Sequence, residues 1–432
     1  MFGRLLSTAV VAGLAVTSVN AISQLSIKGS KFFDSDGNQF YIKGVAYQLT
    51  DQDPLVDETQ CNLDASLMKT LGANTIRVYH VDPTQDHKAC MSAFANNGIY
   101  LFVDLDTFDT AISEDDPAWN TTQLTAFEQV LDEFQKYDNT AGVLVGNEVL
   151  TVGNGSVAAP YVKAAARDIK AYRASKKYRD IPVGYSAADI ASLRPMLQNY
   201  LACGTNSSET VDFFSLNAYE WCGDSSYVTS GYSQLSTNAT DYDIPIFFSE
   251  TGCNTNPPRT FDDQSAIFGD DMNQIWSGAI VYEWLEEENN YGLISYAPKE
   301  AATASGAPDG YVRSGTPTPV SPDFANLQSQ WSTLTPTGTP MSAYSPTNSP
   351  PACPASTAGV WEVNGNTPLP TLGQAYQASS STSSTAPKAT GTSTGTAPSK
   401  TATKKGSASG GKEIAGMSVG LATVMLCFMW WL

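Results

Sequence analysis

The 432-residue chain is poor in positive charge and nearly devoid of histidine. It contains 24 Lys and Arg against 43 Asp and Glu, for a formal net charge of -19, and its two histidines are His80 and His87. The shortage of basic residues argues against a nucleic-acid partner and against electrostatic adhesion to an anionic membrane. No CxxC pair occurs, and so few histidines disfavour a zinc or haem site. We expect no metal and no cofactor, and interpret both histidines as structural or surface residues.

Residues 1–21 have the pattern of a secretory signal peptide. Arg4 precedes the apolar run LLSTAVVAGLAV, and SVNA supplies small residues before a cleavage point after Ala21. The alternative, a membrane anchor, would need about 20 apolar residues, and this run is shorter. The sequence therefore predicts secretion.

Residues 407–432 have the pattern of a glycosylphosphatidylinositol (GPI) anchor signal that is removed. The stretch KKGSASGGKE supplies small residues and a short polar spacer, and the apolar tail IAGMSVGLATVMLCFMWWL follows. Ser407, Ser409 and Gly410 are the candidate attachment sites. The alternative is a tail-anchored helix, which the N-terminal signal disfavours. We expect a protein tethered to the outer face of the plasma membrane by its lipid anchor.

Six of the seven cysteines precede the apolar tail, which contains Cys427. An even set in a secreted chain predicts disulfides, although these observations do not choose among the possible pairings. The six are Cys61, Cys90, Cys203, Cys222, Cys253 and Cys353.

Four N-glycosylation sequons also fit a secreted protein, and each predicts a stretch of chain at the surface. They begin at Asn120, Asn154, Asn206 and Asn238.

Short apolar runs alternate with helix-length stretches, such as residues 63–72 and 121–137, over residues 40–284. Near-continuous apolar strands separated by helices indicate a parallel sheet covered on both faces, and the length is typical of a (β/α)8 TIM barrel. An open doubly wound sheet commonly has a glycine-rich first turn, which GVAYQ lacks. We predict an α/β barrel domain at residues 22–300. Its expected strands are residues 40–47, 75–80, 100–105, 143–146, 182–186, 213–219, 245–249 and 279–284.

The barrel pattern ends near residue 300, where Pro, Thr, Ser and Gly become frequent. Cys353 suggests that residues 301–365 form an extension attached to the barrel by a disulfide. Residues 366–406 are rich in Ser, Thr and Pro and predict a disordered, O-glycosylated stalk.

Two glutamates stand at predicted strand ends, where barrel enzymes place their chemistry. Glu148 follows VLVGN and Glu250 follows PIFFS; 250 minus 148 is 102 residues, against about 94 for three βα units of a typical barrel. Two carboxyls facing each other across the barrel mouth suit glycosidic bond cleavage with retention. The alternative is that both are capping or salt-bridged residues.

Aromatic and polar residues at the other strand ends favour the catalytic interpretation, because aromatic rings stack on sugars and tyrosine hydroxyls stabilise carboxylates. On the eighth predicted strand, period two predicts that Tyr282 and Trp284 share one face and that Glu283 takes the other. The remaining strand-end residues are Tyr79, Asp104 and Tyr219.

The motifs IKGVAYQ, NTIRVYHVDP, YLFVDL, VGNEV, SLNAYEWCG, FFSETGCN and VYEWLEEENNYGL resemble the fungal cell-wall β-1,3-glucanosyltransferases of glycoside hydrolase family 72. The resemblance covers residues 25–355 and implies a (β/α)8 barrel with Glu148 as acid/base and Glu250 as nucleophile. It also implies sugar-binding or supporting roles for Gln48, Tyr79, Asp104, Asn147, Tyr219, Tyr282 and Tyr291.

The resemblance further implies three disulfides, Cys61 with Cys90, Cys222 with Cys253 and Cys203 with Cys353. No cysteine-rich stretch follows Cys353, so the chain resembles the short subgroup without a carbohydrate-binding module. Two positions depart from the family pattern. Residue 251 is Thr where an aromatic is expected, and residue 284 is Trp where Tyr is expected. Both departures are expected to bear on acceptor preference.

The function that this resemblance implies is elongation of cell-wall β-1,3-glucan by a monomer that binds a donor and an acceptor chain. The alternatives are a secreted retaining β-glucan hydrolase, which would use the same carboxyl pair, and an inactive structural glycoprotein of the wall.

Overall fold

The computed structural model describes residues 22–377, except residues 51, 52, 108, 303, 305 and 308. The predicted signal peptide, most of the stalk and the anchor signal with Ser407, Ser409 and Gly410 lie outside the described residues. Among the described residues, no helix is both long enough and apolar enough to cross a membrane.

Eight parallel strands close into a barrel, in the order β10-β11-β4-β5-β6-β7-β8-β9. The predicted barrel is therefore confirmed, and each strand overlaps the apolar run that predicted it. The strands are β4 (Ile42–Ala46), β5 (Thr75–Val78), β6 (Tyr100–Asp104), β7 (Thr140–Asn147), β8 (Val183–Ala188), β9 (Phe213–Asn217), β10 (Ile246–Thr251) and β11 (Trp276–Val281).

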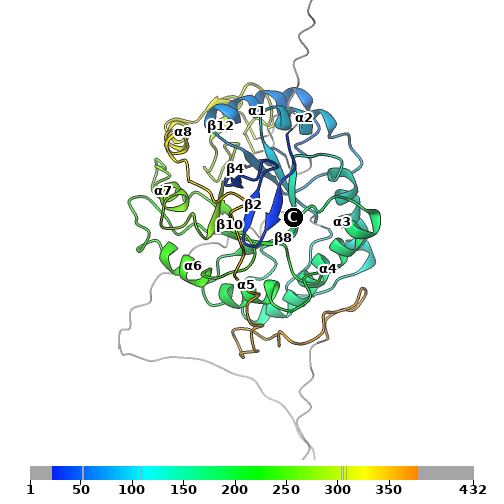
Figure 1. The fold of residues 1–432 in the computed structure, drawn as a ribbon. Helices are drawn as coiled ribbons and strands as arrows, with labels where there is room; N and C mark the ends of the chain where they lie inside the picture. The colour runs from blue at the N-terminus through cyan, green and yellow to red at the C-terminus, as the bar shows by residue number, and fades with distance from the viewer. Residues whose placement is uncertain are drawn as a thin grey trace, which may run out of the picture. The chain divides into compact units, whose positions relative to one another are not determined.

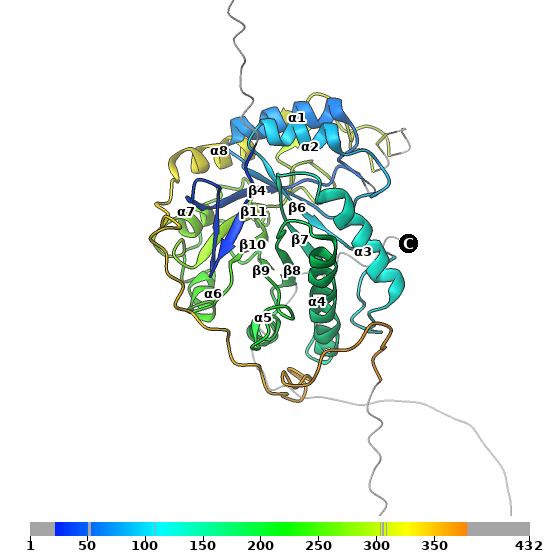
Figure 2. The ribbon, with the colours of Figure 1, turned by 45° about the vertical axis from the view of Figure 1, so that its right-hand side comes forward.

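A ring of helices covers the outside of the barrel (Figures 1 and 2). Asp57 caps the first helix by accepting from the Thr59 and Gln60 amides, and a capping box joins Asn120 to Gln123 at the start of the third. The helices are α1 (Glu58–Leu71), α2 (Lys88–Asn96), α3 (Thr121–Phe134), α4 (Ala159–Lys176), α5 (Arg194–Ala202), α6 (Tyr232–Asn238), α7 (Asp263–Phe268) and α8 (Asp323–Thr333), with a 3-10 turn, η1, at Asn154–Ala158.

A small antiparallel sheet of β1 (Ser26–Lys28), β2 (Lys31–Phe33) and β3 (Gln39–Phe40) packs against one end of the barrel. Phe32 from β2 lies 6.1 Å, between ring centroids, from Phe102 and also from Phe213. These rings need space inside the barrel, and glycines provide it. A Cβ on Gly184 would lie 2.2 Å from the Phe213 ring. This apolar packing fills the barrel interior and leaves the opposite end, where the strands finish, for polar side chains.

The chain beyond the last barrel strand remains attached to the barrel. A short pair, β12 (Ile294–Ser295) and β13 (Thr318–Pro319), precedes α8, and the segment after α8 then runs along the outside past α5 and α4 (Figure 2). The Tyr376 amide donates to the Pro117 carbonyl at 2.9 Å. The attached extension therefore continues past residue 365, its predicted end. The reason is backbone pairing with the segment before α3, which composition does not reveal.

Three disulfides are present, and they are the pairs that the resemblance implies. Cys61–Cys90 joins α1 to α2, and Cys203–Cys353 joins the end of α5 to the extension. Cys222–Cys253 joins the loops that follow β9 and β10. The third bridge therefore lies on the side of the barrel to which the strand ends point.

Candidate active site

Glu148 and Glu250 both stand at the ends of barrel strands. Glu250 is within β10, and Glu148 comes one residue after β7, with its amide donating to the Ser186 carbonyl at 2.9 Å. Glu148 has a positive φ of 50°, an uncommon conformation for a residue with a side chain and one that is concentrated at functional sites. The sharp change of direction there ends the apolar strand and presents the carboxyl at the barrel mouth.

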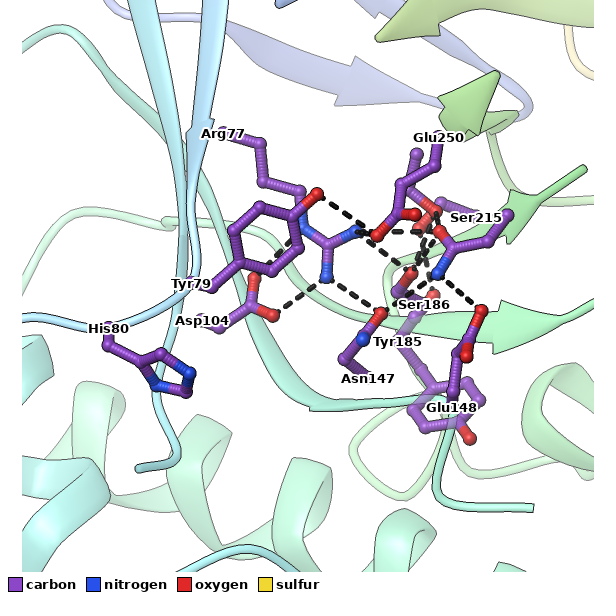
Figure 3. Close-up of polar contacts among 12 residues, drawn as sticks. Arg77, Tyr79, His80, Asp104, Asn147, Glu148, Tyr185, Ser186, Ser215 and Glu250 are labelled. Atoms are coloured by element: carbon purple, nitrogen blue, oxygen red, sulfur yellow. Dashed lines mark hydrogen bonds and ion pairs between the residues drawn. The ribbon is translucent and has the colours of Figure 1, made fainter. Parts of the chain in front are cut away.

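Three donors surround the carboxyl of Glu250, and Figure 3 shows two of them, Tyr79 and Arg77. The Tyr79 hydroxyl donates to Oε1 at 3.0 Å and the Tyr219 hydroxyl donates to Oε2 at 2.8 Å. Nη1 of Arg77 lies 3.4 Å from Oε1. Because a guanidinium can only donate, and because both phenols point their O–H groups at the carboxyl, the surroundings suit a carboxylate.

The pKa of Glu250 reflects opposing influences. Burial raises it from 4.5 to about 7, against the lowering effect of Arg77, and the nearby Glu148 carboxyl raises it while Tyr219 and Tyr79 lower it. The desolvation that raises the pKa also makes the ionised carboxylate more reactive than one in water. Above a pH of about 7, Glu250 is therefore a buried and reactive carboxylate.

Glu148 has a different environment. Nδ2 of Asn217 donates to Oε1 of Glu148 at 2.8 Å, and the Glu148 side chain is partly exposed at the mouth. Within the described residues no lysine or arginine forms an ion pair with Glu148, whereas Arg77 pairs with Glu250. Arg77 and the two phenols therefore stabilise a carboxylate at Glu250. The two carboxyls therefore differ in their surroundings, since donors hold both oxygens of Glu250 whereas Glu148 lies at the partly exposed mouth.

Arg77 is the central residue of the network, and the sequence interpretation missed it. It is completely buried, and it makes a bidentate pair with Asp104, with Nε 3.1 Å from Oδ1 and Nη2 2.7 Å from Oδ2. Nη2 also donates to Oδ1 of Asn147 at 3.0 Å. The available signal was a charged residue within the apolar run TIRVYH, which is rare unless the charge is paired.

Asn217 and Ser186 are two further residues that the sequence interpretation missed. Asn217 Nδ2 donates both to Glu148 and to Oδ1 of Asn147, the latter at 3.0 Å, so one amide orients two neighbouring side chains. Its own oxygen accepts from the Ser186 hydroxyl at 2.9 Å and from the Ser249 hydroxyl at 2.8 Å. Both serines are fully buried. Small hydroxyls inside FFS and VGYS gave little signal, because Ser is common in ordinary strands.

The structure gives supporting positions to two predicted substrate residues. Asp104 is 2 % exposed and its carboxylate is occupied by Arg77, so it neutralises the buried guanidinium. Oε1 of Gln48 accepts from the amides of Tyr79 and His80 at 2.9 and 3.1 Å. Gln48 thus fixes the segment that carries the Tyr79 phenol.

Three tyrosines form an aromatic wall beside Glu250. The Tyr291 ring lies 5.6 Å from that of Tyr219 and 5.5 Å from that of Tyr282, both edge to face. All three are partly exposed, as a sugar-stacking surface requires. We define Tyr219, Tyr282 and Tyr291 as the tyrosine wall.

The predicted arrangement of residues 282–284 is wrong. Tyr282 faces the barrel mouth, whereas Trp284 is completely buried and packs against Phe324 of α8. The period-two rule fails because β11 ends at Val281, before these three residues. Glu283 is 3 % exposed and lies inside the fold.

The two departures from the family pattern also lie behind the site rather than on its surface. Thr251 is 1 % exposed, and its hydroxyl bonds to Asp263 at 3.1 Å and to the Tyr232 hydroxyl at 3.2 Å. Trp284 has no exposed surface. Neither side chain can contact an acceptor directly, so the expectation that they bear on acceptor preference is not supported by their positions.

His87 has a structural position, as expected. It is buried with Nε2 2.7 Å from Oδ2 of Asp53 and Nδ1 3.2 Å from Oε1 of Glu133. Burial lowers the pKa of His87, but the hydrogen bonds and charges of the two carboxylates outweigh it and raise the pKa above its usual value. In the described part of the chain, no group of three or more His, Cys, Asp and Glu side chains could hold a metal ion.

Comparison with known proteins supports this geometry. The family model described as Glucanosyltransferase matches residues 14–307. The 1,3-beta-glucanosyltransferase gas2 of Schizosaccharomyces pombe is 43% identical over 358 residues, covering 79% of this chain and 74% of the relative. The 1,3-beta-glucanosyltransferase GAS5 of Saccharomyces cerevisiae is 40% identical over 385 residues, covering 86% and 75%. The structure of Saccharomyces cerevisiae GAS2P in complex with laminaritriose and laminaritetraose is similar, with a TM-score of 0.74 and 39% identity, covering 82% of this chain and 78% of that chain.

Proposed function

Because this chain belongs to the glucanosyltransferase family, we propose that it is a retaining 1,3-β-glucanosyltransferase that elongates β-1,3-glucan. It cleaves an internal linkage of a donor glucan and joins the new reducing end to the non-reducing end of an acceptor glucan. The observation that carries the proposal is the carboxyl pair at the barrel mouth. Glu250 accepts from Arg77 and two phenols, and Glu148 accepts from the Asn217 amide.

In the first step Glu250 acts as the nucleophile. A carboxylate oxygen forms a bond to the anomeric carbon of the donor while the bond to the glycosidic oxygen breaks. Glu148 gives its proton to that oxygen, and the reducing-end fragment leaves. The Tyr79 and Tyr219 hydroxyls hold the attacking carboxylate in a fixed orientation, which lowers the entropic part of the barrier.

In the second step Glu148, now ionised, takes the proton from a hydroxyl at the non-reducing end of the acceptor. The acceptor oxygen attacks the anomeric carbon, the ester bond to Glu250 breaks, and the configuration is retained after two inversions. Asn147 is proposed to bond the donor 2-hydroxyl, where hydrogen bonds strengthen in the transition state. Its amide oxygen is already fixed by Arg77 and Asn217, which leaves its Nδ2 as the group available for that contact.

Transfer exceeds hydrolysis only if the acceptor occupies the site and excludes water from the ester. The tyrosine wall lies beside Glu250 and presents flat apolar faces suited to sugar rings. We propose that it binds the acceptor.

The test is a product ladder. Purified protein is incubated with a reduced β-1,3-gluco-oligosaccharide of one length, and products are resolved by chromatography. Products longer than the donor support the transferase. Only shorter products would indicate a hydrolase, and no change in the donor would indicate an inactive wall glycoprotein. The Glu250→Gln variant is the matched control and should leave the donor intact.

The proposed cellular setting follows from the sequence patterns and fits the fungal relatives. We propose secretion, attachment by a GPI anchor at Ser407, Ser409 or Gly410, and action as a monomer at the outer face of the plasma membrane and in the cell wall. The four sequon asparagines are proposed to carry glycans. Asn154 and Asn206 are exposed, and Asn120 and Asn238 are partly exposed.

A further inference from the structure

Glu283 is a buried carboxyl that the proposed reaction does not use. It is 3 % exposed and comes two residues after β11, next to Tyr282 of the tyrosine wall. Among the described residues, no lysine or arginine lies within ion-pair distance of it. The nearby Arg313 pairs instead with Glu287 and Asp309. Burying a carboxyl without a cation is costly, so its presence calls for a function.

The carboxyl of Glu283 fixes the turn that carries Tyr291. Its Oε1 accepts from Nδ2 of Asn289 at 2.7 Å, and Oδ1 of Asn289 in turn accepts from the Tyr291 amide at 3.1 Å. The Glu283 amide donates to the Tyr291 carbonyl at 3.0 Å. Two side-chain hydrogen bonds and one backbone bond therefore connect Glu283 to the rim tyrosine.

Asn254 anchors the far side of the same turn. Its Nδ2 donates to the carbonyls of Asn289 and Asn290 at 2.7 and 3.0 Å. Asn254 follows Cys253, whose disulfide with Cys222 joins the loops after β9 and β10. The turn is therefore held from two sides, and Glu283 supplies the inner one.

Glu283 also acts on Tyr282. Burial raises the pKa of Tyr282 above its usual value, and the charges of Glu283 and Glu250 raise it further. Burial in turn raises the pKa of Glu283 well above 4.5, and Glu287 and Glu250 raise it further while Asn289 opposes them.

We propose that Glu283 is a positioning residue that holds Tyr282 and Tyr291 of the tyrosine wall in the geometry that binds the acceptor glucan, and thereby sets the partition between transfer and hydrolysis. This inference rests on the proposed transferase function. Glu283 does not touch the reacting atoms. It acts through Asn289 on Tyr291, whose ring packs against those of Tyr282 and Tyr219, and Tyr219 holds the nucleophile.

The test compares Glu283→Ala, Glu283→Gln and Asn289→Ala with the wild type. Transfer and hydrolysis are measured separately, as the acceptor KM and as kcat for hydrolysis. Removal of the Glu283 carboxyl or the Asn289 amide should lower the transfer-to-hydrolysis ratio about tenfold, the size of one lost hydrogen bond, through a higher acceptor KM. The effects in the double Ala variant should be less than multiplicative, because both substitutions interrupt the same Glu283–Asn289–Tyr291 connection. Glutamine can donate and accept as a neutral acid does, so Glu283→Gln should stay within about twofold of the wild-type ratio.

The control is Glu288→Gln, which changes an exposed carboxyl in the same loop and should leave the ratio unchanged. An unchanged ratio in both Ala variants would overturn the inference, as would an equal loss of transfer and hydrolysis. A Gln variant as impaired as the Ala variant would also overturn it. If Glu283→Ala does not fold, Asn289→Ala carries the test. A wild-type protein that lengthens no donor would instead contradict the proposed function itself.

Discussion

Nη1 of Arg77 lies 3.4 Å from Oε1 of Glu250, and the same guanidinium is fully buried against Asp104. One cation therefore serves two carboxylates, of which Asp104 takes the bidentate contact and Glu250 a single longer one. Glu250 keeps enough negative charge to attack a sugar carbon without being fully neutralised. This sharing is the physical basis for the proposed division of roles between Glu250 and Glu148.

Replacement of Glu250 by Gln should abolish activity, because an amide oxygen is a poor nucleophile. We expect a loss of at least about a thousandfold in both transfer and hydrolysis, measured as initial rates on a single-length donor. The circular dichroism spectrum should remain that of the wild type. Substantial activity in this variant would rule out Glu250 as the nucleophile.

The same variant tests the raised pKa of Glu250 through stability. Burial outweighs the donors around the carboxyl, so folding raises the pKa of Glu250 from 4.5 to about 7. The protonated carboxyl therefore stabilises the fold at pH values below about 4.5, and this contribution is lost as the pH rises through about 7. The unfolding free energy of the wild type relative to Glu250→Gln should fall by up to about 3 kcal/mol over that range. Denaturant unfolding of both proteins from pH 4 to 8 measures the difference, and the other titrating groups cancel. A difference that does not depend on pH would contradict the assignment.

Tyr79→Phe and Tyr219→Phe should each make the ionised form of Glu250 less stable. Each removes one donor and leaves the ring in place, so the pKa of Glu250 rises and the acidic limb of the kcat/KM profile moves to higher pH. At neutral pH we expect a loss of about 10- to 100-fold, typical of a hydrogen bond to a charged group. Tyr376→Phe is the control, because this tyrosine is 38% exposed. Unshifted acidic limbs in both variants would count against the role of the phenols.

Arg77→Met should lower the stability of the folded protein, in addition to any effect on the reaction rate. The substitution leaves Asp104 buried without its cation, which typically costs about 3 to 5 kcal/mol. Urea unfolding measures this loss. The double variant Arg77→Met with Asp104→Leu should recover part of it, because no unpaired charge remains. If the single variant were as stable as the wild type, the network would not have the central role that its contacts indicate.

Removal of the Cys203–Cys353 bridge should affect stability and leave the chemistry intact. The bridge closes a segment with a sequence separation of 150, far from the strand ends that carry the glutamates. A double Ser variant should lose about 4 kcal/mol of stability, with kcat preserved at low temperature. The Cys222–Cys253 bridge gives the contrast, since it anchors the loops beside the tyrosine wall, and its loss should lower transfer. Equal effects of the two bridges on kcat would contradict this distinction.

The sequence was sufficient to predict the barrel and its two glutamates. Apolar runs alternate regularly with helix-length stretches, and each glutamate comes at the end of such a run. It was insufficient for Arg77 and Asn217, whose partners come from other strands and meet only when the barrel closes. The orientation of Trp284 also could not be predicted, because it depends on where β11 ends. The reach of the extension to Tyr376 depends on pairing with a distant segment.

The most direct test of the central claim is to trap the glycosyl ester on the protein. A β-1,3-gluco-oligosaccharyl fluoride with fluorine at the 2-position should form the ester and release it slowly, because the fluorine disfavours the positively charged transition state. Peptide mass spectrometry of the quenched protein should then find one sugar adduct on Glu250. An adduct on Glu148, or turnover of natural donor with inverted products and no adduct, would contradict the account.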